Sequence, residues 1–157
     1  PKPETMWREL TEQDLRDALS DREVESYTRA AAGPEWDPEA AARVLAKTAD
    51  LVRGYIQTSP RRPDMGPGRT LPPSLIGPAA DHAAVTLLRR IPKEIRKERL
   101  DARAEAVGLF KAVAAGEIAV EGHAADGGTA GGARRVSALA PGTGRQRAGA
   151  AQLEGTP

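Results

Sequence analysis

The sequence predicts an all-α protein: a small bundle of about four helices with a long Pro/Gly-rich loop and a short C-terminal extended segment. Apolar residues recur at helical spacing through three long stretches, which are separated by proline and glycine. Hydrophobic residues make up 39% of the chain and aromatic residues only 3%, so Leu, Val, Ile and Ala must form the core. A chain of 157 residues is long enough for one domain with additional segments at its ends.

Two short helices are expected after an extended N-terminal arm at residues 1–10. Each begins with a capping-box pattern, in which a Ser or Thr is followed three residues later by an acidic residue. The pairs are Thr11 with Asp14 and Ser20 with Glu23. Gly33-Pro34 is expected to end the second of these helices.

The first long helix is predicted from Asp37, as the N-terminal cap, to about Ile56. Pro38 stands at the first helical position, where its missing N–H carries no cost. Residues 58–73 follow, and they are too rich in Pro and Gly to form a helix or a central strand. A loop of this length in a small domain is usually functional or disordered.

The remaining helices lie on either side of Pro92. Ser74 is expected to cap a helix that ends before this proline, and a last helix is expected from about Lys93 to Ala115. Gly116 is a natural C-terminal cap for it.

The expected domain organisation follows from these elements. The helical domain covers residues 11–117, and residues 118–121 form a short extended segment. Residues 122–157 contain mainly Gly, Ala, Arg, Thr and Pro without apolar periodicity. Such a composition cannot offset the entropy of ordering, so a flexible tail is expected there unless a partner holds it.

Composition excludes several classes of function. The chain has no Cys, which excludes disulfides, thiolate chemistry and Cys-based zinc sites. The formal net charge is +1, so no overall field favours nucleic acid or an acidic membrane. No apolar run is long enough to span a bilayer, and we expect a soluble protein made in the cytoplasm.

No enzyme motif is present. The two histidines, His82 and His123, are far apart and lack metal-ligand spacing, and His82 is expected to pack on the apolar side of its helix. No nucleophile elbow or phosphate-binding glycine motif occurs in a fitting context. We therefore predict a protein that is not an enzyme, with no catalytic, cofactor-binding or metal-binding residues.

Basic residues are the remaining candidates for function. Those between residues 89 and 103 are interleaved with acidic residues at helical spacing, which is typical of an exposed, salt-bridged face. The alternative is contact with the phosphates of DNA or with a neighbouring subunit. Candidates for this contact are Arg61, Arg62, Arg69, Arg89, Arg90, Lys93 and Arg96. No aromatic residue is interleaved with them, so stacking on bases is not expected.

The charges are unevenly distributed along the chain. The first 25 residues are acidic on balance, whereas the stretch 89–103 is basic. In a ring of identical subunits, an acidic edge can face the basic edge of a neighbour. Pairing of the same two segments within one chain is equally consistent with the sequence.

The order of four segments resembles a known family. Met6-Trp7 and LTEQDLRDALSD precede DPEAAARVLAKTADLVRGYI, which is followed by LPPSLIGPAADHAAVTLLRR and by AVGLFKAVAAGEIAV. This order resembles the head–tail adaptor family of Mu-like phages and prophages, and more widely the helical head-completion connectors. The similarity extends from about Met6 to Glu121. The chain departs from the family pattern at His82, where a small residue or Cys is common, and in its long tail after Gly122.

The resemblance implies a virion protein at the head–tail junction, made in the cytoplasm of a bacterial host. Its partners would be the portal protein, neighbouring adaptor subunits in a homo-oligomeric ring that is commonly twelvefold, a tail-side neck or tail terminator protein, and the genomic DNA that passes through the channel. A C-terminal segment of such connectors docks on the portal. Here that segment would be a short strand formed by Ile118, Ala119 and Val120. The alternative is that this segment folds back on its own bundle.

A second function belongs to a different class. The chain would then be a small DNA-associated packaging or regulatory protein that binds duplex DNA nonspecifically. This function predicts salt-sensitive binding to DNA by the isolated protein and no affinity for a portal.

Overall fold

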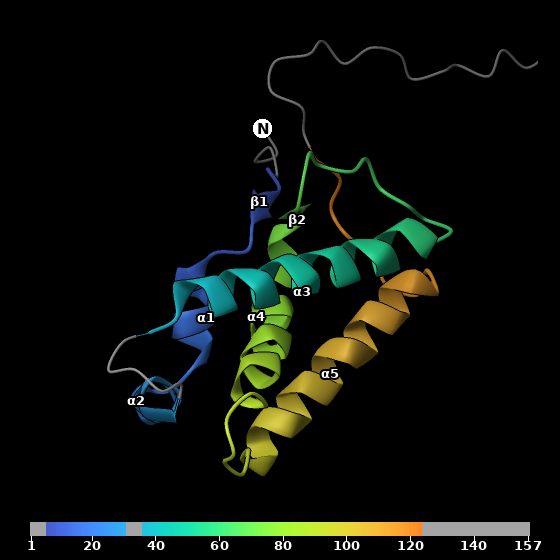
Figure 1. The fold of residues 1–157 in the computed structure, drawn as a ribbon. Coiled ribbons are helices and arrows are strands. Elements are labelled where there is room, and N and C mark those ends of the chain that lie inside the picture. The colour runs from blue at the N-terminus through green and yellow to red at the C-terminus, as the bar shows by residue number, and fades with distance from the viewer. Residues whose placement is uncertain (1–5, 31–35, 124–157) are drawn as a thin grey trace, which may run out of the picture. The chain divides into compact units, whose positions relative to one another are not determined.

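The computed structural model describes residues 6–30 and 36–123 and confirms the predicted all-α fold class (Figure 1). The described elements are β1 (Arg8–Glu9), α1 (Glu12–Ala18), α2 (Asp21–Ala30), α3 (Pro38–Thr58), β2 (Thr70–Leu71), α4 (Pro73–Leu88) and α5 (Lys97–Ala114). They belong to one compact unit. The predicted helix end at Gly33-Pro34 and residues 124–157 of the predicted tail 122–157 lie outside the described residues.

The predicted caps are present at the first three helices. Thr11 and Asp14 form a reciprocal capping box at α1. At α2, the Glu23 carboxylate accepts the Ser20 N–H at 2.8 Å. The side chain of Asp37 accepts the backbone N–H groups of residues 39 and 40 at the start of α3, each at 3.0 Å. Local capping chemistry therefore decides where these helices begin.

Two helices begin elsewhere than predicted. α4 begins at Pro73 with Pro72 in the cap position, so Ser74 lies in the first turn and does not cap the helix. α5 begins at Lys97, and residues 89–96 form an irregular connector. Pro92 has no N–H to offer a helix, and the extended backbone of Arg96 delays the first helical turn.

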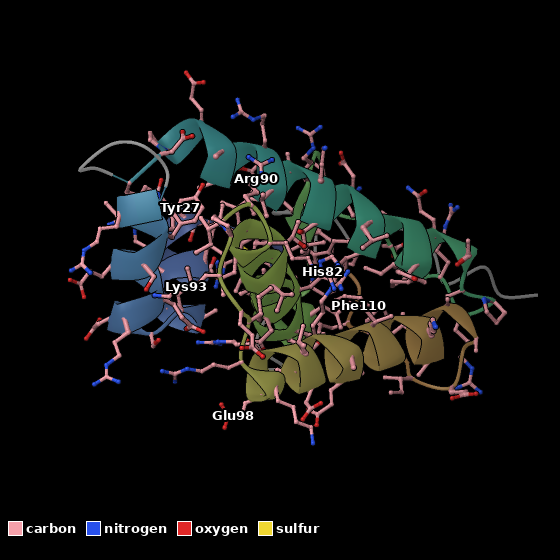
Figure 2. The ribbon with its side chains drawn as sticks, turned by 60° about the horizontal axis from the view of Figure 1, so that its bottom comes forward. Tyr27, His82, Arg90, Lys93, Glu98 and Phe110 are labelled. Carbon is pink, nitrogen blue, oxygen red and sulfur yellow. The ribbon has the colours of Figure 1, made fainter. Side chains whose placement is uncertain are left out.

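α4 is the central helix of the core. It packs against α1, α3 and α5, and its alanines bring the neighbouring backbones close. Phe110 of α5 fills the centre of the core and is fully buried (Figure 2). The other large side chains that are fully buried include Leu15, Val44, Val52, Ile56, Leu71, Leu75, Leu87 and Val113. None of the described helices combines the length and the apolarity that crossing a membrane requires.

The N-terminal arm pairs with the long loop. β1 and β2 are antiparallel, with Arg8 opposite Leu71. Arg53 of α3 anchors the same loop, because its guanidinium donates to the carbonyl oxygens of Thr70 at 2.6 Å and Gly66 at 3.0 Å. The segment 58–73, for which the sequence left disorder open, is therefore ordered by contacts with α3 and with the arm.

Gly116 ends α5 as predicted. Its φ is +77°, and the N–H groups of Gly116 and Glu117 donate to the carbonyls of Val113 and Ala112, which is the Schellman arrangement. A Cβ at this position would lie 2.6 Å from Cγ of Pro60. The turn therefore needs glycine both for its backbone angle and for its close approach to the loop after α3.

Candidate functional site

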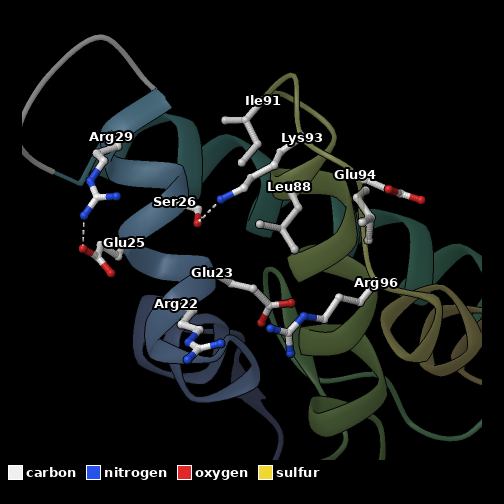
Figure 3. Close-up of a pocket in the computed structure, with 11 residues that line it drawn as sticks. Arg22, Glu23, Glu25, Ser26, Arg29, Leu88, Ile91, Lys93, Glu94 and Arg96 are labelled. Carbon is white, nitrogen blue, oxygen red and sulfur yellow. Dashed lines mark hydrogen bonds and ion pairs between the residues drawn. The ribbon is translucent and has the colours of Figure 1, made fainter.

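A groove lies between α2 and the connector 89–96, and we call it the α2 groove (Figure 3). Its volume is about 410 Å³. Apolar side chains of Leu88, Ile91 and Ile95 line it together with charged residues. The charged and polar residues are Arg22, Glu23, Glu25, Ser26, Arg29, Lys93, Glu94 and Arg96.

Four cationic and three acidic side chains line the α2 groove. Lys93 Nζ donates to Ser26 Oγ at 2.8 Å, and Arg29 forms an ion pair with Glu25 within α2. Arg22 and Arg96 form no ion pair with any of the residues that the structure describes. These solvent-facing guanidinium groups are free to bind phosphate or carboxylate oxygens of a partner.

The structure brings together two of the predicted contact residues, Lys93 and Arg96, and adds two that the sequence analysis missed. Arg22 and Arg29 are seven residues apart on α2, with Ser26 between them. Residues at this spacing lie on one face of a helix. The seven-residue spacing of Arg22 and Arg29 is the sequence pattern that predicts a shared polar face on this helix.

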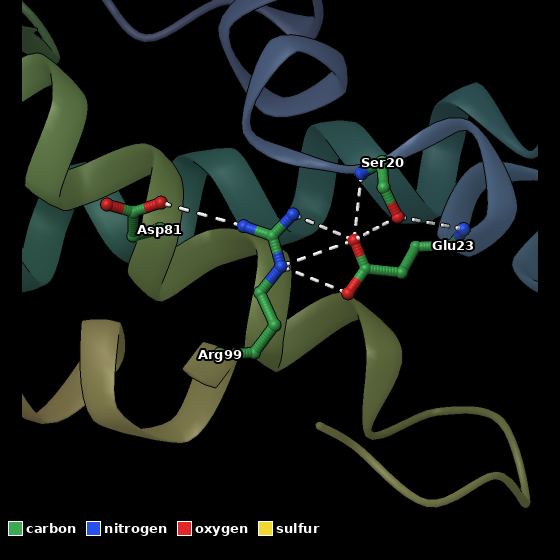
Figure 4. A network of polar contacts seen from close by, with 4 residues as sticks. All are labelled: Ser20, Glu23, Asp81 and Arg99. Carbon is green, nitrogen blue, oxygen red and sulfur yellow. Dashed lines mark hydrogen bonds and ion pairs between the residues drawn. The ribbon is translucent and has the colours of Figure 1, made fainter. Parts of the chain in front are cut away.

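Glu23, which lines the α2 groove, forms an internal ion pair with Arg99 (Figure 4). The Arg99 guanidinium of α5 donates to the Glu23 carboxylate of α2, with a shortest distance of 2.8 Å. Asp81 Oδ1 of α4 lies 3.9 Å from Arg99 Nη1. Although burial raises the pKa of Glu23, the hydrogen bonds from Arg99 and Ser20 outweigh it and hold this pKa at about 2. Here the acidic and basic segments pair within one chain, which was one of the two alternatives.

The other predicted contact residues are dispersed. Arg89 and Arg90 are exposed at the C-terminal end of α4, outside the α2 groove. Arg61 and Arg62 are exposed near Gly116, at the other end of α5, which is about 27 Å long at 1.5 Å per residue. Arg69 is engaged in an ion pair with Asp50, at 2.8 Å. The predicted residues therefore do not form a single surface.

In the chain by itself, residues 118–121 do not form a strand. The backbone N–H of Ile118 donates to the carbonyl of Ala112, and the described chain from there to His123 contains no strand. Val120 is partly buried against the core, whereas Ile118 is 40% exposed and Ala119 is exposed. The segment folds back on its own bundle, because the turn after Gly116 directs it toward the N-terminal arm.

Four residues fasten this segment, and we call them the C-terminal clasp: Trp7, Ser74, Glu121 and His123. The Trp7 indole N–H donates to the Glu121 carbonyl at 2.8 Å, and the Trp7 backbone N–H donates to His123 Nδ1 at 3.2 Å. The N–H and hydroxyl of Ser74 donate to the Glu121 carboxylate at 2.9 and 2.6 Å. Burial raises the pKa of Glu121, but these hydrogen bonds prevail and keep it below its ordinary value.

His82 lies in the core and not in a catalytic cluster. It is 8% exposed, and its ring centre is 6.4 Å from that of Phe110 (Figure 2). Burial, with added repulsion from Arg103 and Arg89, lowers the pKa of His82, so the neutral ring is favoured. In residues 6–30 and 36–123, no group of three or more His, Cys, Asp or Glu side chains could hold a metal ion.

Comparison with known proteins adds no relative to these observations. No protein-family model matches the chain, and no curated protein and no solved structure is significantly similar to it.

Proposed function

We propose that this chain is a structural head–tail adaptor of a tailed phage or phage-like particle, without enzymatic activity. It forms a ring that joins the portal to the tail at the head–tail junction of the virion, and DNA passes through the ring. The observation that carries the proposal is the order of the segments from Met6 to Glu121 that resembles the adaptor family.

The positions of the motif residues support this proposal. Tyr55 of α3 and Phe110 of α5, which belong to separate motifs, lie with their ring centres 6.0 Å apart. Pro72-Pro73 begins α4, and Gly116 ends α5. The residues that carry the resemblance thus lie in the core and at the helix ends of one compact unit, as expected if they specify a common fold.

The exposed cations suit a conduit for DNA. Arg22 and Arg96 at the α2 groove, and Arg61 and Arg62 in the loop after α3, lie on the surface. Phosphate contacts of this kind depend little on sequence and weaken with salt, which allows DNA to pass without being held.

Docking on the portal would use the exposed part of the C-terminal segment, Ile118 and Ala119. The test is electron microscopy of the full chain co-expressed with the portal protein of the same particle. We expect a ring stacked on the portal, and we expect Ile118→Asp to prevent stacking. Leu51→Asp is the matched control, because Leu51 of α3 is also 40% exposed. If the portal fails to bind the wild-type chain at every salt concentration tested, the adaptor function is overturned. If Ile118→Asp still stacks on the portal, the assignment of the docking segment is overturned.

Arg22 and Arg96 line the α2 groove without an ion pair in the described part of the chain, and they favour a second candidate, a small DNA-associated packaging or regulatory protein. It predicts a gel shift with duplex DNA that weakens steeply with salt, in the absence of any portal. A tight shift together with no portal complex would establish this alternative over the adaptor.

A further inference from the structure

A second groove lies on the outer face of α5, with a volume of about 500 Å³. We call it the basic groove. Its lining residues are Arg89, Leu100, Arg103, Ala104, Val107, Gly108 and Lys111. Three of these side chains are cationic and none is a carboxylate.

The cations of the basic groove lack partners within the chain. Arg89, Arg103 and Lys111 form no ion pair across residues 6–30 and 36–123. Nε of Arg103 is buried and has no hydrogen-bond partner in that part of the chain. Burial and the nearby Arg89 both lower the pKa of Arg103. A carboxylate brought by another molecule would bind the exposed cations of this groove, Arg89 and Lys111, and offset the unpaired positive charge.

The shape of the basic groove also points to an external partner. Gly108 is exposed in the middle of α5, and a Cβ there would meet nothing within 4 Å. Glycine is less favourable than alanine inside a helix, and no contact within the chain requires it at this position. Leu100, which lines the same groove about two turns earlier on α5, is 39% exposed. Small residues next to an exposed leucine allow another helix to approach α5 closely.

A groove of opposite charge lies between α1 and α4, with a volume of about 280 Å³, and we call it the acidic groove. It is lined by Asp14, Asp17, Ala18, Ile76, Gly77, Ala80 and Asp81. The pair with Arg8 neutralises Asp14. Asp17 accepts a hydrogen bond from Gln13 and forms no ion pair with the residues that the structure describes, and Asp81 lies 3.9 Å from Arg99. Gly77 resembles Gly108, because it is exposed within a helix and a Cβ there would meet nothing within 4 Å.

We propose that the basic groove of one copy of this chain binds the acidic groove of a second copy, head to tail. The two grooves carry opposite charge, and each has a helical glycine that leaves room for a close approach. The grooves share no lining residue, so each copy presents both surfaces and can bind two others. An interface between two different surfaces generates a ring or a filament, not a closed dimer. This inference rests on the ring that the adaptor function requires, and it names the surfaces that form it.

Cysteine cross-linking tests the direction of assembly, because the full chain contains no cysteine of its own. Gly108→Cys and Gly77→Cys are made as separate proteins and oxidised alone or mixed. We expect a cross-linked dimer in the mixture and none in either protein alone. Cross-linking of Gly108→Cys with itself would overturn the head-to-tail arrangement. The absence of a cross-link in the mixture at any concentration would overturn the interface.

Charge reversal tests the electrostatic part. Lys111→Glu and Asp17→Lys change exposed residues, one in each groove. In one experiment both cysteine proteins carry Lys111→Glu, and in another both carry Asp17→Lys. Either reversal by itself is expected to lower the yield of cross-linked dimer by about tenfold or more, because like charges then face each other. When both cysteine proteins carry both reversals, most of the yield is expected to return. Lys47→Glu is the matched control on the exposed surface of α3 and leaves the yield unchanged. Equal yields from all variants would overturn the charge complementarity.

The portal experiment separates this inference from the proposed function. Rings on the portal without any cross-link between positions 77 and 108 would overturn the interface and leave the adaptor function intact. A cross-link between these positions in a chain that binds no portal would support the interface and overturn the adaptor function.

Discussion

The C-terminal clasp and the α2 groove use polar side chains in opposite ways. In the clasp, the polar groups of Trp7, Ser74 and Glu121 bind one another across the chain. At the rim of the α2 groove, Arg22 and Arg96 face solvent without an ion pair in the described part of the chain. Polar groups that are satisfied internally stabilise the fold, whereas unpaired surface cations contribute little to it and remain available to a partner. The two regions should therefore respond differently to mutation.

The largest expected effect is in the clasp. Trp7 is 4% exposed, so Trp7→Ala creates a cavity and removes the indole hydrogen bond to Glu121. We expect the free energy of unfolding to fall by about 3–5 kcal/mol, measured by urea denaturation. Trp7→Phe retains most of the apolar contact and should cost about half as much. A loss for Trp7→Ala no larger than that of a surface substitution would show that the clasp does not stabilise the fold.

The Arg99–Glu23 pair beside the α2 groove behaves as part of the fold. Its side chains are only 22% and 12% exposed. Glu23→Gln is expected to lower the free energy of unfolding by about 2 kcal/mol at pH 7, because the charged hydrogen bonds are lost. The pKa of Glu23 is depressed to about 2, so its contribution is complete above the ordinary value of 4.5 and is lost as the pH falls toward 2.

Denaturation across this pH range checks the assignment. Wild type should lose stability between pH 4.5 and 2 more steeply than Glu23→Gln, because the variant has no carboxylate to protonate at this position. Identical pH profiles would mean that another carboxylate governs the acid response.

A matched pair of serines compares the two regions directly. Ser74→Ala removes both the hydroxyl contact with Glu121 at 2.6 Å and the support for its charge, and should cost about 1 kcal/mol. Ser26→Ala removes a single hydrogen bond, from Lys93 at 2.8 Å, and should change stability by less than about 0.5 kcal/mol. Equal losses in urea denaturation would contradict the distinction between clasp and groove.

The smallest effect on stability is expected at the groove rim, where the effect on binding is instead measurable. Arg22→Ala and Arg96→Ala should each change the free energy of unfolding by less than about 0.5 kcal/mol. Each should reduce the slope of log affinity against log salt for duplex DNA by about 1 if it contacts a phosphate. Arg69→Ala is the control, because Arg69 is already paired with Asp50. Unchanged slopes for both rim variants would exclude the α2 groove as a surface that contacts DNA.

The sequence by itself determined the helical class and most helix boundaries. Thr11, Ser20, Asp37 and Gly116 act through backbone groups within four residues of themselves, so their effect is readable from local spacing. The same reasoning failed at Ser74, whose N–H and hydroxyl bind Glu121 instead of capping a helix. Local spacing also did not show that residues 118–121 lie against the arm in the chain by itself, where they form no strand.

Only the tertiary structure decided which distant residues meet. Trp7 and Glu121 are 114 positions apart, and Arg99 and Glu23 are 76 apart. The α2 groove likewise joins Arg22 to Arg96 across α3, α4 and the loop between them. Such contacts depend on how the amphipathic helices pack around the buried α4, and many partners of suitable charge were available along the chain. Local periodicity specifies which face of a helix is apolar, but the shared core selects the neighbour that this face meets.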